Sequence, residues 1–174
     1  MLKLTGLPAM VATALLMSAA ADAAPLRSHP GACVRADGPA LAVHVEGFKA
    51  RRGQVRVQTY GGSPDSFFEK GRYIDRSDLP VPATGAAELC VPVTRPGTYA
   101  VSVRHDMDGD HKTGRADGGG MSGNPDVSLM DLLFRRKPDP AAVAVRVGTG
   151  AAAVPVTLNY IQGTAFRPVP QTGR

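Results

Sequence analysis

The stretch "TYAVSVRHDMDGDH", residues Thr98 to His111, joins a strand pattern to an acidic loop. Tyr99, Val101 and Val103 alternate with other residues, and this two-residue period is the signature of a half-buried β-strand. His105 continues the apolar face at the end of the pattern. The stretch therefore predicts a strand that runs directly into a loop rich in aspartate.

The same alternation recurs along the chain and predicts further strands. It appears in "ALAVHVEGF" (40–48), "GQVRVQTY" (53–60), "AELCVPVT" (87–94), "AAVAVRV" (141–147) and "AVPVTLNY" (153–160). Pro92 and Pro155 fall inside two of these patterns, so those strands should lie at sheet edges or carry bulges. Many short strands with Pro and Gly turns predict an all-β fold. We expect an antiparallel Ig-like or prealbumin-like β-sandwich of about seven strands, with at most one short helix.

Two other segments have weaker patterns. Residues 126–137, "DVSLMDLLFRRK", favour either a short helix with Leu129, Leu132 and Leu133 facing inward or an irregular strand, and the sequence leaves both open. Residues 63–85 have the composition of a long polar connection between strands.

The first 23 residues are typical of a secretory signal peptide. A basic residue precedes a short apolar run, and Ala21-Asp22-Ala23 forms an A-x-A cleavage site. We expect cleavage after Ala23 and a periplasmic or secreted protein with no transmembrane segment after cleavage; an uncleaved N-terminal anchor is the alternative. The expected organisation is a signal peptide (1–23), an N-terminal extension (24–39), a β-sandwich domain (40–160) and an extended tail (161–174).

The chain has two cysteines, Cys33 and Cys90. An isolated pair in an oxidising compartment most often forms one disulfide, which here would tie the N-terminal extension to a later strand. A redox or metal-binding thiol pair is the alternative, but the sequence has no C-x-x-C motif.

The formal net charge of +5 does not predict nucleic-acid binding. Lys and Arg are scattered, aromatic residues are few, and the dense basic pieces "KARR" (49–52) and "RRK" (135–137) fall where turns are expected. We expect a monomer with an unidentified envelope or extracellular partner.

The acidic loop has the spacing of a calcium-binding loop. With Asp106 first, the third, fifth and twelfth positions are also aspartates, and the seventh would offer a backbone carbonyl: Asp108, Asp110, Asp117 and Lys112. His111 stands where such loops carry Gly. The sequence thus predicts a weak calcium site, with a solvated turn as the alternative.

A catalytic interpretation is the main rival to a binding module. His105 beside Asp106 could act as a general base with Ser122 as nucleophile, or His105 could bind zinc with His111. A histidine that only hydrogen-bonds the adjacent loop is the simpler interpretation, because no nucleophile motif accompanies it. We therefore predict a non-enzymatic protein, with a periplasmic hydrolase as the alternative.

The segments "PGTYAVSVRHDMDGDHKTG", "GGGMSGNP", "SLMDLLF" and "VPVTLNY" together resemble a secreted bacterial family, domain of unknown function 2141. The residues that match its motif are Gly97, Tyr99, Ala100, His105, Asp106, Asp108 and Asp110, with Asp in place of the usual Asn at 108 and 110. The family's Gly falls on His111 and its closing Asp on Gly114. The resemblance implies an exported β-sandwich without an established activity.

Overall fold

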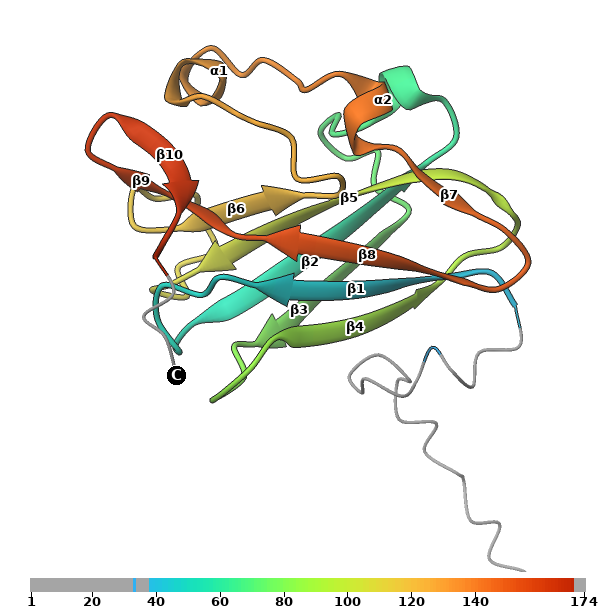
Figure 1. Cartoon of the computed structure of the whole chain (residues 1–174), viewed down its shortest axis with the longest axis horizontal. Helices are drawn as coiled ribbons and strands as arrows, with labels where there is room; N and C mark the ends of the chain where they lie inside the picture. The colour runs from blue at the N-terminus through green and yellow to red at the C-terminus, as the bar shows by residue number, and fades with distance from the viewer. Residues whose placement is uncertain (1–32, 34–37, 171–174) are drawn as a thin grey trace, which may run out of the picture.

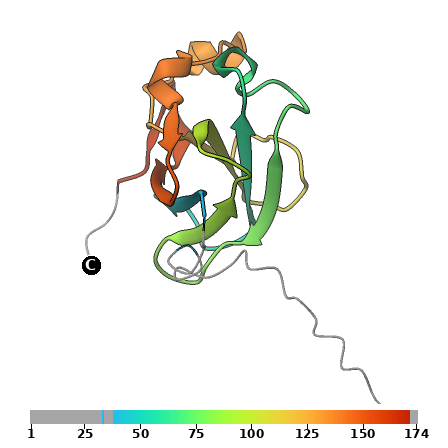
Figure 2. The ribbon, with the colours of Figure 1, turned by 90° about the vertical axis from the view of Figure 1, so that its right-hand side faces the viewer.

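The computed structural model describes residue 33 and residues 38–170, and its strands form two facing sheets (Figures 1 and 2). The small sheet has the order β4-β1-β8, with strands β1 (Ala40–Glu46), β4 (Ala87–Pro92) and β8 (Ala151–Thr157). The large sheet has the order β10-β9-β6-β5-β2-β3, and β7 also pairs with β5. Its strands are β2 (Gln54–Gly61), β3 (Asp75–Pro80), β5 (Gly97–Asp106), β6 (Gly118–Met121), β7 (Val145–Val147), β9 (Asn159–Gln162) and β10 (Ala165–Pro168).

Strand β5 is the centre of the large sheet. It pairs antiparallel with β2 along its length, with β6 at its C-terminal end and with β7 at its N-terminal end. Tyr99, Val101 and Val103 are buried on the face that meets the small sheet, as their alternation predicts. Ala100 is buried too, because a second apolar cluster with Tyr60, Phe67 and Val143 covers the outer face.

The main core lies between the two sheets. Strands of both sheets contribute alternate apolar residues, since successive side chains of a strand point to opposite faces. Burying a Val or Leu side chain contributes roughly 1.5–3 kcal/mol to folding, so this row of residues holds the sheets together. Its fully buried members include Leu41, Val43, Val45, Val55, Val57, Val101, Val154, Val156, Leu158 and Tyr160.

The predicted all-β sandwich is confirmed, with differences in detail. The described residues form ten strands and two short α-helices, α1 (Leu129–Leu133) and α2 (Pro140–Val143), and also a 3-10 turn, η1 (Pro64–Ser66). One strand pair, β1 with β8, is parallel. Pro92 and Pro155 lie on β4 and β8, the two edge strands of the small sheet, as predicted.

Several predicted boundaries were wrong. Residues 141–143 belong to helix α2, where Pro140 and the Asp139 cap favour a helical turn, so the expected strand is reduced to β7. Residues 63–85 hold η1 and strand β3 within the expected connection. The glycine-rich residues 118–121, which lie outside every predicted strand, form β6, because β5 and β9 on either side supply its hydrogen-bond partners.

The expected helix and the expected tail also need correction. In residues 126–137 only α1 is helical, and Leu132 and Leu133 are 38% and 70% exposed rather than buried in the core. The sheet continues past residue 160, since β9 runs to Gln162 and pairs with β10 inside the expected tail. Antiparallel pairing with a strand already in the sheet fixes β10.

The predicted disulfide is confirmed. Cys33 is bonded to Cys90 on β4, which ties the chain before β1 to the edge of the small sheet. Such a bond is typical of proteins outside the reducing cytoplasm. The predicted signal peptide and its cleavage site lie outside the described residues. Among those described, no helix has the length and apolar character needed to cross a membrane.

Candidate cation-binding loop

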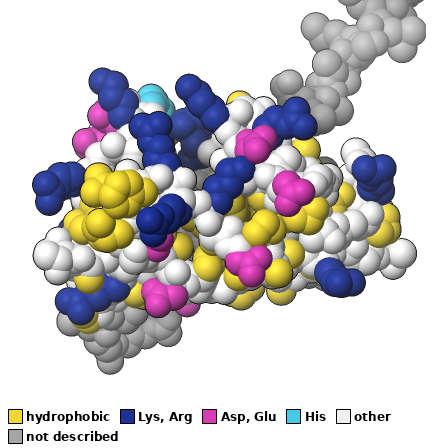
Figure 3. All heavy atoms as spheres, turned by 90° about the horizontal axis from the view of Figure 1, so that it is seen from above, with side chains coloured by type: hydrophobic (Ala, Val, Ile, Leu, Met, Phe, Trp, Pro, Cys, Tyr) yellow, Lys and Arg dark blue, Asp and Glu magenta, His cyan; other side chains and the backbone are white. Residues whose placement is uncertain are grey.

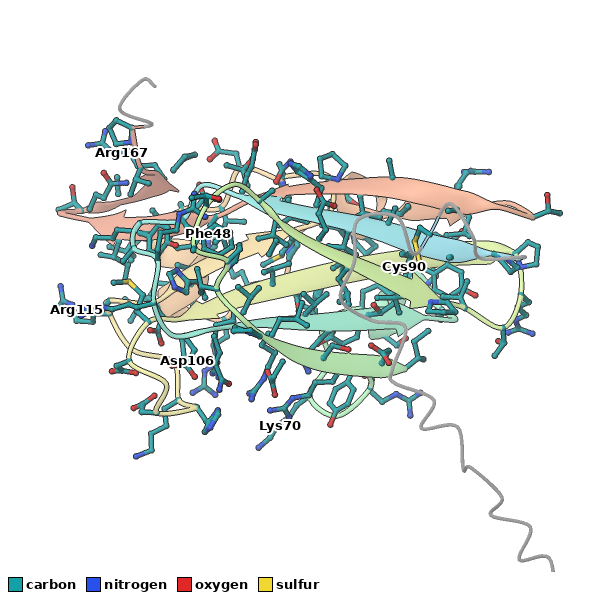
Figure 4. The ribbon with its side chains drawn as sticks, turned by 90° about the horizontal axis from the view of Figure 1, so that it is seen from below. Phe48, Lys70, Cys90, Asp106, Arg115 and Arg167 are labelled. Atoms are coloured by element: carbon teal, nitrogen blue, oxygen red, sulfur yellow. A yellow bond between two sulfur atoms is a disulfide. The ribbon has the colours of Figure 1, made fainter. Side chains whose placement is uncertain are left out.

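The acidic loop connects the end of β5 to the start of β6. Asp106 is the last residue of β5, and Asp117 directly precedes β6, so the antiparallel pairing of the two strands brings these carboxylates to the same end of the sheet. Figure 4 shows Asp106 at the base of this loop, toward the end of the sandwich away from the disulfide at Cys90. The loop is thus anchored at both ends by the central strands.

Two of the aspartates are buried and hold the backbone of the loop. The carboxylate of Asp106, 1% exposed, accepts hydrogen bonds of 2.9 Å from both Gly109 N and His111 N. The carboxylate of Asp117, 6% exposed, accepts from Met107 N at 3.1 Å and Gly114 N at 2.7 Å. Buried carboxylates need such partners because an unsatisfied buried charge is costly, so these two residues define the loop's shape.

A third carboxylate completes a cluster of oxygens. One carboxylate oxygen each from Asp106, Asp108 and Asp117 lies within 4.8 Å of the others. Asp108 is exposed, so the cluster has two buried members and one that faces solvent. Asp110 is outside this group of three, and its carboxylate instead accepts from Lys112 N at 2.7 Å. The structure therefore brings together three of the four predicted carboxylates.

The backbone of the loop turns at two residues with positive φ. Gly109 has φ of 73°, where glycine carries no steric penalty. His111 has φ of 62°, in the left-handed region that favours glycine, although histidine is among the residues enriched there. The conformation expected for a glycine at the sixth loop position is thus retained with His111 in its place.

Basic groups border the cluster. Arg104 Nη2 lies 3.4 Å from Asp106 Oδ2, and Arg104 Nη1 donates to Thr113 Oγ1 at 3.2 Å. The ring of His111, 59% exposed, is 3.8 Å from the same Asp106 oxygen. The Arg104 guanidinium reduces the mutual repulsion of the carboxylates and would compete with a bound cation.

His105 is buried in the core and has partners for both ring nitrogens. Its Nε2 lies 2.8 Å from the carbonyl oxygen of Arg52, which can only accept, so Nε2 carries the proton. Its Nδ1 then accepts from the Tyr160 hydroxyl at 2.6 Å. Burial lowers the pKa of His105 and raises the pKa of Tyr160 to about 12, so the pair is neutral at physiological pH.

His105 and Ser122, the base and the nucleophile of the catalytic interpretation, make hydrogen bonds to different partners. Ser122 is fully buried, donates to Val143 O and accepts from Val101 N at 3.0 Å. Because the His105 ring contacts Tyr160 and Arg52, the histidine and the serine have separate partners. The simpler interpretation expected the ring to hydrogen-bond the acidic loop that follows it, whereas its partners are Tyr160 on β9 and Arg52 in the β1–β2 connection.

Sequence reasoning missed two residues that shape this region, Tyr160 and Arg104. Tyr160 belongs to a strand pattern 55 residues away from His105, and only the pairing of β6 with β9 brings it there. The contact of Arg104 with Asp106 could have been predicted, because side chains two residues apart lie on the same face of a strand.

The fold and loop define a mostly β, two-sheet domain with an acidic loop after its central strand. Residues 43–154 match the family described as uncharacterized protein conserved in bacteria (DUF2141), and the chain belongs to that family. No curated protein and no solved structure matches the chain.

Proposed function

We propose that the protein is an exported, non-enzymatic binding module of the bacterial envelope. Its acidic loop binds a divalent cation, for which Ca²⁺ is the first candidate. The observation that carries the proposal is the convergence of Asp106, Asp108 and Asp117 oxygens within 4.8 Å. Ca²⁺ takes six to eight oxygen ligands, mostly carboxylate, carbonyl and water. Three carboxylates form a partial shell, to which the Lys112 carbonyl and water would add.

The hydrogen bonds of the loop are compatible with this proposal. Asp106 Oδ1 and both oxygens of Asp117 each accept one backbone N–H and keep a second lone pair for a cation, whereas Asp106 Oδ2 also accepts from Arg104 Nη2. Because the backbone is already held, binding would order few further residues. The partial shell and the nearby Arg104 predict weak affinity, in the sub-millimolar to millimolar range of extracellular modules.

The test is calcium titration by calorimetry, together with thermal melting in CaCl₂ and in chelator. Asp108→Ala is the decisive variant, because Asp108 is exposed and its loss leaves the buried carboxylates in place. We expect Ca²⁺ to raise the melting temperature of the wild type and not that of this variant. Asp126→Ala, an exposed acid outside the loop, is the matched control and should behave as wild type.

Asp110→Ala separates the two ligand sets. If the ligands are Asp106, Asp108 and Asp117 only, this variant keeps most of the Ca²⁺ affinity. If Asp110 is also a ligand, as the sequence spacing predicts, the variant loses affinity as Asp108→Ala does. An absence of heat and of any melting shift at millimolar CaCl₂ would mean that the loop is a solvated turn.

A further inference from the structure

Large apolar side chains are exposed together at α1. Met130, Leu132, Leu133 and Phe134 are 53%, 38%, 70% and 60% exposed, and they account for four of the six exposed large hydrophobic residues in the described part of the chain. Monomeric soluble proteins rarely expose apolar side chains in a contiguous group without a function. We call residues 128–137 the α1 tip.

Specific contacts hold the α1 tip in the conformation that exposes its apolar side chains. Ser128 and Asp131 form a capping box, in which the Ser128 side chain accepts from Asp131 N and the Asp131 side chain accepts from Ser128 N. Leu132 lines a small cavity against the large sheet together with Phe166. Lys137 Nζ reaches back to Glu69 at 3.2 Å. The inner side of the segment is thereby fixed, and the outer side presents its apolar residues to solvent.

Positive charge directly adjoins the apolar group. Arg135, Arg136 and Lys137 follow Phe134 in sequence, and the guanidinium of Arg136 lies over the Phe134 ring at 5.4 Å. Arg136 is also 3.7 Å from Asp131, and Arg135 is exposed. Figure 3, which looks onto this side of the molecule, shows apolar side chains gathered beside Lys and Arg.

We propose that the α1 tip docks the protein onto an anionic phospholipid surface. Exposed Leu, Met and Phe beside Arg and Lys is the combination that binds the boundary between headgroups and acyl chains. Apolar side chains enter this boundary, and each adjacent basic residue is attracted to anionic headgroups. Guanidinium groups suit phosphate because they donate two parallel hydrogen bonds.

Charge complementarity selects a phospholipid surface over a purely apolar groove. An apolar groove would accept Leu133 and Phe134 only, whereas an anionic surface would also attract the exposed Arg135 and Arg136, the latter only 3.7 Å from one acid, Asp131. The net charge of +5 also favours approach to an anionic surface. This proposal is independent of the cation-binding loop, because it involves none of the same residues.

The test is co-sedimentation of the protein with vesicles of phosphatidylglycerol or of phosphatidylcholine. We expect binding to the anionic vesicles, weakened by added salt, and little binding to the zwitterionic ones. Leu133→Ser with Phe134→Ser should reduce binding by about tenfold or more, since each buried CH₂ contributes substantially. Both side chains are exposed, so the fold should persist.

Two further variants separate the contributions. Arg135→Asn with Arg136→Gln should weaken binding and reduce its salt dependence; Asn tolerates the positive φ of Arg135. Ile74→Ser removes an equally exposed apolar side chain outside the α1 tip and should leave binding unchanged. All variants keep the same N-terminal residues, so any binding by those residues is common to all.

The proposal fails if the wild type does not bind anionic vesicles, or if the Leu133/Phe134 variant binds as the wild type does. It also fails if analytical ultracentrifugation shows a wild-type dimer that this variant abolishes while vesicles stay unbound. The apolar residues would then meet a second copy.

Discussion

The hydroxyl of Tyr160 on β9 reaches across β6 to hydrogen-bond Nδ1 of His105 on β5, at 2.6 Å. In the sheet register His105 is opposite Gly118, and Gly118 is opposite Tyr160. Because the residue between them is glycine, the tyrosine ring can lie over β6. The row of three residues joins three strands next to the acidic loop.

The first prediction concerns Gly118. A Cβ at this position would lie 2.5 Å from atoms of the Tyr160 ring, whereas at Gly119 the nearest atom is 3.6 Å away. Gly118→Ala should therefore lower the free energy of unfolding by about 1–3 kcal/mol, because the ring must shift. Urea unfolding measures this effect. Gly119→Ala is the matched control and should change stability far less; equal losses in both would show that the ring contact is unimportant.

The second prediction concerns the Tyr160 hydroxyl. Tyr160→Phe leaves Nδ1 of His105 buried without its donor and removes the acceptor for Lys49 N at 3.1 Å. An unsatisfied buried polar group costs about 1–3 kcal/mol, which should appear as a lower urea midpoint with an unchanged slope. Tyr73→Phe, at an exposed tyrosine, should have a negligible effect. A wild-type midpoint in Tyr160→Phe would contradict the role assigned to the bond.

The third prediction concerns pH. Burial holds the pKa of His105 below its ordinary value, about 6.5 in the unfolded chain. As pH falls below 6.5, His105 takes up a proton in the unfolded chain but not in the folded protein. The free energy of unfolding therefore decreases as pH falls from about 6.5 to the lower pKa of folded His105. The slope is at most about 1.4 kcal/mol per pH unit.

Unfolding in urea at a series of pH values from neutral to mildly acidic measures this slope. His105→Gln should reduce the slope relative to the wild type. Since His105→Gln also changes absolute stability, only the slopes are compared. The same slope in this variant and in the wild type would assign the pH dependence to other groups.

The fourth prediction concerns the disulfide. Cys33→Ser with Cys90→Ser opens a loop with a sequence separation of 57. In the chain-entropy model its closure stabilises the folded state by about 4 kcal/mol, so the double variant should melt at a clearly lower temperature. Reduction of the wild type should reproduce this shift. A melting temperature that neither change lowers would leave the bond without a stabilising role.

The fifth prediction concerns His111. Its φ of 62° is costly for a residue with a Cβ and free of strain for glycine, so His111→Gly should stabilise the loop by about 0.5–1 kcal/mol. Thermal melting in chelator measures the effect apart from any cation. His44→Gly, within strand β1, should instead destabilise the protein. Destabilisation by His111→Gly would mean that the imidazole itself holds the loop.

The sequence by itself determined the strand faces and the place of the acidic loop. Alternation in Leu41, Val43 and Val45, or in Val101 and Val103, depends only on the pleat of a single strand, and the structure buries these residues as predicted. The spacing of Asp106, Asp108 and Asp117 is likewise local, and three of the predicted carboxylates converge. An isolated cysteine pair, together with the expected signal peptide, was enough to predict the disulfide.

Only the tertiary structure decided which strands pair and which surfaces stay exposed. The "KARRG" segment has hairpin length, yet β1 and β2 belong to different sheets: β1 pairs with β4 and β8, and β2 pairs with β3 and β5. Gly118 to Met121 became a strand because β5 and β9 lie on either side. The exposure of the α1 tip and the bond from Tyr160 to His105 likewise depend on contacts between residues far apart in sequence, which no local pattern encodes.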